Sequence, residues 1–226
     1  MEKAARWLKK SLQYEFHDSD LLRLALTHRS ATGSNNERLE YLGDAVLDTV
    51  VSEIIYRQRP DADEGTLSRL RSYLVKDSAL AELAGELGIG RYIVLGSGEK
   101  KTGGHRRESI LADAVEALFG AVYLDSGFDA ARDLICRAYG DRFRQLPDSS
   151  DLRDPKTALQ EYLQARQMAL PDYRMEKVSG KAHQQTFEMS CSIPGVTHRT
   201  IGSGGSRRDA EQLAAERMLA KLTAES

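Results

Sequence analysis

The sequence predicts an all-α domain followed by a small α+β domain of order α-β-β-β-α. Three observations predict this fold class: a helical period in the first two thirds of the chain, a polar segment that interrupts it, and a strand-like alternation after that segment. The chain has 226 residues, of which 41% are hydrophobic and 29% are charged. This composition is typical of a protein that buries a core, in one large domain or two modest ones.

The first part of the chain repeats leucine and alanine every three to four residues, which is the period of an amphipathic helix. The pattern begins at residues 21–26 and continues from residue 67 to residue 87. Few windows alternate strictly between apolar and polar residues. We therefore expect residues 1–145 to form an all-helical domain.

A linker is predicted next. Residues 145–155 carry two prolines, several serines and aspartates, and no sustained period. We place the linker at residues 146–153, so that the second domain covers residues 154–226.

The second domain shows the period of a strand. Apolar and polar residues alternate from residue 187 to residue 193, as in a half-buried strand, and this alternation places the thiol of Cys191 in the core. Companion strands are expected at residues 173–180 and 196–203, and helices at residues 157–167 and 206–222.

Composition also excludes several classes of protein. No apolar run approaches the ~18 residues of a membrane helix, and the first residues lack the apolar stretch of a signal peptide. Cys136 and Cys191 are the only cysteines and stand far apart, which excludes a disulfide framework and a cysteine-based zinc site. Neither a phosphate-binding P-loop nor a serine nucleophile motif is present. We therefore expect a cytoplasmic protein with no membrane partner and no small-molecule cofactor.

One predicted helix carries acids on a single face. Glu37, Glu40 and Asp44 are spaced i, i+3 and i+7. A solvated face opposite the apolar stripe is the simpler interpretation. Against it, Glu40 and Asp44 form a like-charge i,i+4 pair, and Asp44 and Asp48 form another, where a solvated face usually offers a Lys or Arg. The pattern favours a cation supplied from outside the helix.

A second helix gives a stronger signal. Residues 108–124 are apolar nearly all round, which is typical of a buried helix, yet Asp113 and Glu116 lie inside it at i, i+3. No Lys or Arg occurs between residues 108 and 131 to pair with them. A buried carboxylate is costly unless it is neutralised or bound to a metal, and protonated or hydrogen-bonded core acids are the alternative. Oxygen-only ligands suit Mg²⁺ or Mn²⁺, and such ions support phosphodiester hydrolysis.

The last helix opens with a basic turn. Ser206 is the expected N-cap, with Asp209 three residues on. Arg207 and Arg208 follow in the first turn, where the helix dipole disfavours cations. A docked polyanion would explain them, and pairing with Asp209 or Glu211 is the alternative. Because 32 Lys and Arg face 34 Asp and Glu in the whole chain, only a local phosphate-binding edge is predicted.

Several segments resemble bacterial ribonuclease III, in that family's own order. They are residues 26–30 (LTHRS), 37–45 (ERLEYLGDA), 63–65 (DEG) and 106–118 (RRESILADAVEAL). Residues 154–163 and 210–212 resemble the family's double-stranded-RNA-binding domain. The resemblance spans essentially the entire chain.

The resemblance implies an endonuclease domain that forms a homodimer and cuts double-stranded RNA with Mg²⁺, for which Mn²⁺ would substitute. Substrates would be rRNA precursors and structured transcripts, cut to 5′-phosphate and 3′-hydroxyl ends with a short 3′ overhang. The family's metal positions fall on Glu40, Asp44, Asp113 and Glu116, and its catalytic positions on Asp44, Glu116, Glu37 and Glu64. The RNA contacts that it implies come from Gln160, Glu161, His183, Ser206, Arg207 and Arg208.

Two residues depart from the family pattern. Tyr41 replaces the commoner Phe where the ring contributes to the dimer interface, and its hydroxyl needs a polar partner if it is buried. Glu211 stands where many such RNA-binding domains carry a third basic residue, which would weaken RNA affinity. Two alternatives to a nuclease stay open: an RNA-binding protein that does not cut, and an acidic structural dimer whose tail binds protein.

Overall fold

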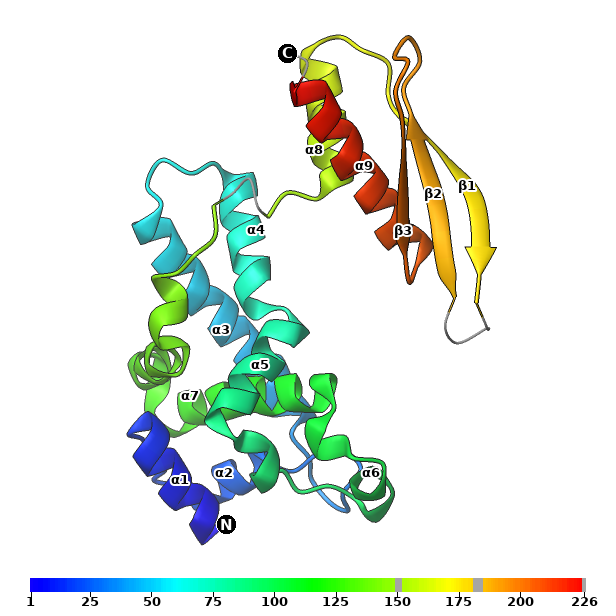
Figure 1. Cartoon of the computed structure of the whole chain (residues 1–226). Helices are drawn as coiled ribbons and strands as arrows, with labels where there is room; N and C mark the ends of the chain where they lie inside the picture. Colours follow the sequence, from blue (N-terminus) through cyan, green and yellow to red (C-terminus); the bar gives the residue numbers. More distant parts are fainter. Residues whose placement is uncertain (149–151, 181–184, 225–226) are drawn as a thin grey trace. The chain divides into compact units, whose positions relative to one another are not determined.

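The computed structural model describes residues 1–148, 152–180 and 185–224 of the chain. The chain folds as two compact units, Met1–Ser149 and Ser150–Ser226. The first unit is helical, and the second combines two helices with a three-stranded sheet (Figure 1). The predicted fold class is therefore confirmed.

The first unit is built around its last long helix. This helix, α7, packs against α1, α2, α3 and α5, and its most extensive contact is with α3. Its middle is buried, from Ala114 to Val122 on several sides, as the apolar sequence predicted. The α-helices of this unit are α1 (Glu2–Leu12), α2 (Ser19–Ala25), α3 (Glu37–Gln58), α4 (Glu64–Val75), α5 (Asp77–Leu87), α6 (Ser97–Lys101) and α7 (Glu108–Tyr139).

Helix α7 changes direction at Gly127, whose φ of 83° and ψ of −176° lie outside the helical region. Glycine adopts this conformation without the penalty that a Cβ imposes. Just before the break, Asp125 accepts hydrogen bonds from the hydroxyl of Tyr14 at 2.5 Å and from the backbone N–H of Asp18 at 2.9 Å. Desolvation raises the pKa of Asp125, but these hydrogen bonds outweigh it and hold the pKa well below its ordinary value. The segment between α1 and α2 is thereby fastened to α7.

The backbones of α3 and α7 touch at two glycines. A Cβ on Gly43 would overlap the carbonyl oxygen of Glu116, and a Cβ on Gly120 would overlap that of Leu39. A glycine inside a helix costs about 1 kcal/mol relative to alanine, so its presence here is explained by the close approach. The contact sets the acidic face of α3 beside the acids of α7.

The second unit contains α8 (Pro155–Ala165), β1 (Asp172–Ser179), β2 (Thr186–Ser192), β3 (Arg199–Gly204) and α9 (Arg207–Ala224). The strands form an antiparallel sheet in the order β1-β2-β3, and both helices pack on one of its faces (Figure 1). The core between them includes Leu159, Met218 and the fully buried Cys191. The predicted core position of this cysteine is confirmed.

The third strand begins later than the sequence predicted. A strand was expected from residue 196, but β3 starts at Arg199, which pairs with Ser192. Val196 instead donates its backbone N–H to the carbonyl of Ile193 at 3.0 Å, and Gly195 has a φ of 84°, so the chain turns here. Alternation along a short segment cannot show where a turn ends.

Among the described residues, none of the helices combines the length and the apolar character that crossing a bilayer requires.

Candidate functional site

Three carboxylates from α3 and α7 meet beside the glycine contact. One oxygen each of Glu40, Asp113 and Glu116 lie within 4.8 Å of one another, and we call these three residues the acidic cluster. All three are partly buried. Three carboxylate oxygens at this spacing form a donor set that suits a hard divalent cation, so the cluster fits Mg²⁺ or Mn²⁺.

Crowding and burial raise the pKa of all three carboxyl groups. The pKa of Glu116 rises to about 8, because of desolvation first and then the charges of Asp44 and Glu40. Desolvation and the charge of Asp113 raise the pKa of Glu40. Desolvation and the charge of Asp77 raise that of Asp113. Full ionisation of the cluster therefore needs positive charge, which a bound cation supplies.

Asp44 and Glu37 flank the cluster on α3, and both are exposed. Asp44 is not one of the three residues whose oxygens lie within 4.8 Å, but its charge has the largest effect of any neighbour on the pKa of Glu116. Glu37 stands at the start of α3, where its Oε1 lies 3.5 Å from Nη1 of Arg29 and its Oε2 accepts a hydrogen bond from Asn35 at 3.1 Å. The structure thus brings three of the four expected metal ligands together and sets Asp44 beside them.

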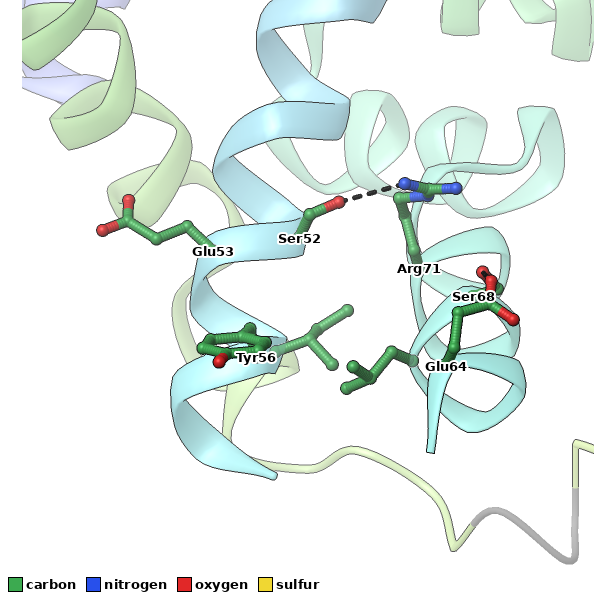
Figure 2. Close-up of a pocket in the computed structure, with 8 residues that line it drawn as sticks. Ser52, Glu53, Tyr56, Glu64, Ser68 and Arg71 are labelled. Carbon is green, nitrogen blue, oxygen red and sulfur yellow. Dashed lines mark hydrogen bonds between the residues drawn. The ribbon is translucent and has the colours of Figure 1, made fainter. Parts of the chain in front are cut away.

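Glu64 lies on another helix than the acidic cluster and lines a separate cavity. It begins α4, accepts a hydrogen bond from the hydroxyl of Ser68 at 2.8 Å, and lines a cavity of about 430 Å³ between α3 and α4 (Figure 2). Across this cavity Arg71 donates to the hydroxyl of Ser52 at 3.2 Å. The Nε atom of Arg71 lies 4.0 Å from Oδ2 of Asp48, whose Oδ1 is buried without a hydrogen-bond partner. Glu64 is not part of the acidic cluster.

The sequence did not predict that three residues, His28, Arg29 and Asp77, act on the acidic cluster. His28 is buried with its Nδ1 at 2.8 Å from the hydroxyl of Ser30. The charges of His28 and Arg29 partly offset the rise in the pKa of Asp113, and Asp77 adds to it. His28 and Arg29 lie in the segment 26–30 that resembles the family, but nothing in that segment assigned them to the cluster, and Asp77 carries no distinctive local signal. In particular, an acid in the first turn of a helix, such as Asp77, is the ordinary complement to the helix dipole.

The second unit presents most of its expected RNA contacts on its two helices. Gln160 and Glu161 are exposed on α8. Ser206 caps α9, because its Oγ accepts the backbone N–H of Asp209 at 3.1 Å, as the capping pattern predicted. His183 lies outside the described residues.

Both arginines of the basic turn have acidic neighbours. Nε of Arg207 lies 2.9 Å from Oε1 of Glu211, and Nη2 of Arg208 lies 3.9 Å from Oδ2 of Asp154. The alternative that the sequence left open, pairing with an acid of the same helix, therefore holds for Arg207. Their side chains are nevertheless 62% and 82% exposed, so both remain accessible to a polyanion.

Fold and site together define a class of protein: a helical nuclease domain joined to a domain that binds double-stranded RNA. One family model supports each half: "Ribonuclease-III-like" matches residues 18–142, and "Double-stranded RNA binding motif" matches residues 155–222.

Individual relatives extend the match to nearly the whole chain. The protein called Ribonuclease 3 in Alkalilimnicola ehrlichii is 54% identical over 95% of this chain and 94% of its own length. The Ribonuclease 3 of Nitrosococcus oceani is 55% identical over 97% and 95%. The crystal structure of the nuclease domain of ribonuclease III from Campylobacter jejuni is 43% identical, with a TM-score of 0.60 over 64% of this chain and 99% of that domain. The chain belongs to the ribonuclease III family, and it is an endoribonuclease.

Proposed function

We propose that this protein cuts double-stranded RNA in a reaction that depends on Mg²⁺, for which Mn²⁺ substitutes. The products would carry 5′-phosphate and 3′-hydroxyl ends with short 3′ overhangs, and the substrates would be rRNA precursors and structured transcripts. The acidic cluster carries the proposal, because it gathers three carboxylate oxygens in a chain that also has a double-stranded-RNA-binding domain. The cytoplasmic location stays a prediction.

In this proposal the acids share two tasks, holding the ion and orienting a water molecule. The ion would be held by Glu40, Asp113 and Glu116. The adjacent Asp44 would add a further negative charge beside the ion. A bound divalent cation lowers the pKa of a water molecule and offsets negative charge at the phosphate. The carboxylates of Asp44 and Glu116 would orient that water through hydrogen bonds to its protons.

Glu37 and Glu64 would line the surface on which the RNA lies. Both are exposed, and an ionised carboxylate can accept a hydrogen bond from a 2′-hydroxyl group. RNA displays these hydroxyls in its wide, shallow minor groove. Contacts of this kind would favour RNA over DNA.

A homodimer would place two such centres on one duplex, each cutting one strand, which accounts for an overhang. Support comes from Tyr41, a neighbour of Glu40 in the chain, whose side chain is 81% exposed. A large exposed aromatic ring is a typical component of a protein interface, and an uncrowded hydroxyl can reach water or a polar group of a partner. A related nuclease domain, from Campylobacter jejuni, has been described in terms of a region involved in dimer formation.

The second unit would hold the duplex by its shape and phosphates rather than by its sequence. Gln160, Glu161, His183 and Ser206 would contact the minor groove and sugars, and Arg207 and Arg208 the phosphates.

A cleavage assay tests the proposal. A long, perfectly paired RNA is incubated with the protein in Mg²⁺, in Mn²⁺ and in EDTA, and the products are sized and their ends labelled. Short duplexes with 5′-phosphates are expected with either metal and none in EDTA. A retarded but uncut duplex would instead indicate a protein that only binds RNA. Neither cutting nor binding would indicate a structural role.

A further inference from the structure

We propose that Glu211 is a charge brake on the RNA-binding edge: it offsets one of the two positive charges of Lys156 and Arg207 and so weakens the attraction of the edge to the phosphates of any duplex. The inference rests on the proposed binding of double-stranded RNA. It adds a residue that limits the electrostatic contribution to the affinity for RNA.

Glu211 lies between two cations that belong to different helices. Its Oε2 accepts a hydrogen bond from Nζ of Lys156 at 2.7 Å, and its Oε1 accepts one from Nε of Arg207 at 2.9 Å. Only 12% of the Glu211 side chain is exposed, against 34% of Lys156 and 62% of Arg207. The carboxylate is enclosed by the two groups that it neutralises.

Lys156 is also held from its other sides. Its Nζ lies 4.4 Å from the centroid of the Tyr173 ring. Its backbone N–H donates to Oε1 of Gln212 at 3.1 Å and to Oδ1 of Asp154 at 3.0 Å, and Gln212 also donates to Asp154. The first turns of α8 and α9 are thus joined, and Glu211 stays next to its cations.

The enclosed carboxylate is ionised at neutral pH. Desolvation raises the pKa of Glu211, but the hydrogen bonds and charges of Lys156 and Arg207 outweigh it, and the net effect lowers the pKa. The three side chains together therefore carry one positive charge instead of two.

This reduction in charge has a different effect on each part of RNA recognition. Affinity from counterion release grows with the number of cations that neutralise phosphates, and it does not distinguish one polyanion from another. Contacts to 2′-hydroxyls and to A-form shape do not depend on that number. Removing the charge of Glu211 should therefore tighten binding to RNA and DNA duplexes by a similar factor and leave the preference for RNA nearly unchanged.

The test uses Glu211→Gln in the full-length protein, because glutamine keeps the size and an acceptor oxygen while removing the charge. Dissociation constants are measured in EDTA, where no cleavage is expected, for an RNA duplex and a DNA duplex of the same sequence over a series of KCl concentrations. The variant should bind RNA roughly three- to tenfold more tightly in ~0.1 M salt, with a log–log salt slope steeper by up to about one. Its gain for DNA should be of similar size.

Glu216→Gln is the matched control, since it makes the same charge change at an exposed position of the same helix. It should alter affinity less than about twofold. An equal gain in this control would assign the effect to net charge and overturn the proposal, and so would unchanged or weaker RNA binding by Glu211→Gln.

A double substitution that leaves the net charge unchanged provides a second test, in case Glu211→Gln destabilises the domain. Lys156→Gln combined with Glu211→Gln should keep a wild-type salt slope, while Lys156→Gln alone should flatten it. If the double variant and Lys156→Gln share the flatter slope, Glu211 is not a brake. If the wild-type chain binds no duplex RNA, the proposed function itself fails. If the wild type binds RNA but Glu211→Gln shows no gain in affinity, only the proposed role of Glu211 is wrong.

Discussion

Among single residues, Glu116 links the chemistry of the site to the stability of the fold. Its pKa rises from an ordinary value of 4.5 to about 8, because of desolvation and then the neighbouring acids. A carboxyl group whose pKa is higher in the folded chain favours folding while it is protonated. Its contribution is fully present below pH 4.5 and is lost as the pH rises to about 8.

We therefore expect the metal-free chain to lose stability between pH 4.5 and pH 8, and Glu116→Gln to remove part of that loss. At the upper end the variant should be more stable than the wild type by roughly 1–2 kcal/mol, a value reduced for solvent screening of a partly exposed group. Mg²⁺ should raise the melting temperature of the wild type more than that of the variant, because a ligand stabilises the state that binds it. Thermal unfolding followed by circular dichroism checks both. Parallel pH profiles for the two proteins would contradict the prediction.

The same substitution should separate binding from cutting. Glu116→Gln should leave the affinity for duplex RNA nearly unchanged and reduce turnover by orders of magnitude, because a metal ligand is lost while the RNA-binding edge is intact. Single-turnover cleavage and a binding assay in EDTA measure the two effects. Asp133→Asn, at an exposed position of α7 beyond Gly127, should retain wild-type turnover. Comparable turnover in Glu116→Gln would remove this residue from the list of ligands.

Among the elements, the crossing of α3 and α7 decides where the acids lie. Gly43 and Gly120 let the two backbones touch, and Glu40 and Glu116 stand within one helical turn of that point. The packing of two helices therefore does what no single helix could do, since it gathers ligands that are far apart in the sequence.

Gly43→Ala should disturb the fold and the site together. Its Cβ would overlap the backbone of α7, so we expect a loss of about 1–3 kcal/mol or more in the free energy of unfolding, and a large loss of turnover. Gly85→Ala is the control, because nothing lies within 4 Å of a Cβ at that helical position, and it should stabilise α5 by up to about 1 kcal/mol. Chemical denaturation and the cleavage assay measure both outcomes. Wild-type stability in Gly43→Ala would show that the helices can separate at no cost.

The residue pattern predicted what is local, and only the resemblance to a known family placed the acids of two helices in one site. Helical spacing placed Glu40 on one face of α3, and Asp113 and Glu116 on one face of α7, because side-chain direction follows from the helix itself. The crossing at Gly43 has only one local sign, a glycine inside a helix, and that sign does not name its partner. Asp77 reaches the cluster through the packing of α5 on α7, which no spacing encodes. Similarly, the start of β3 at Arg199 follows from its pairing with Ser192.

In the whole molecule, the two kinds of charge belong to different units. The acidic cluster lies in the first unit, and the basic turn of Arg207 and Arg208 lies in the second. With a net charge of only −2, the chain does not attract a polyanion as a whole. Binding must come from the placement of a few cations.

Replacing Arg207 and Arg208 together by alanine should therefore weaken binding to duplex RNA of any sequence. The salt dependence should flatten by up to about two in log–log slope, because up to two phosphate contacts are lost. Turnover at saturating RNA should stay near the wild-type value. Lys221→Ala, in the last turn of the same helix, should change affinity much less. An unchanged salt slope in the double variant would exclude these arginines as phosphate contacts.

The backbone contact between α3 and α7 also has a consequence for the loss of activity on heating. Ligands held on separate loops could drift apart while the rest of a protein stayed intact, so that activity would disappear before the structure did. Here the acids belong to two helices whose backbones are in contact at the centre of their domain. We therefore expect no folded state in which the carboxylates have moved apart. Thermal inactivation and melting of the first unit should follow a single curve.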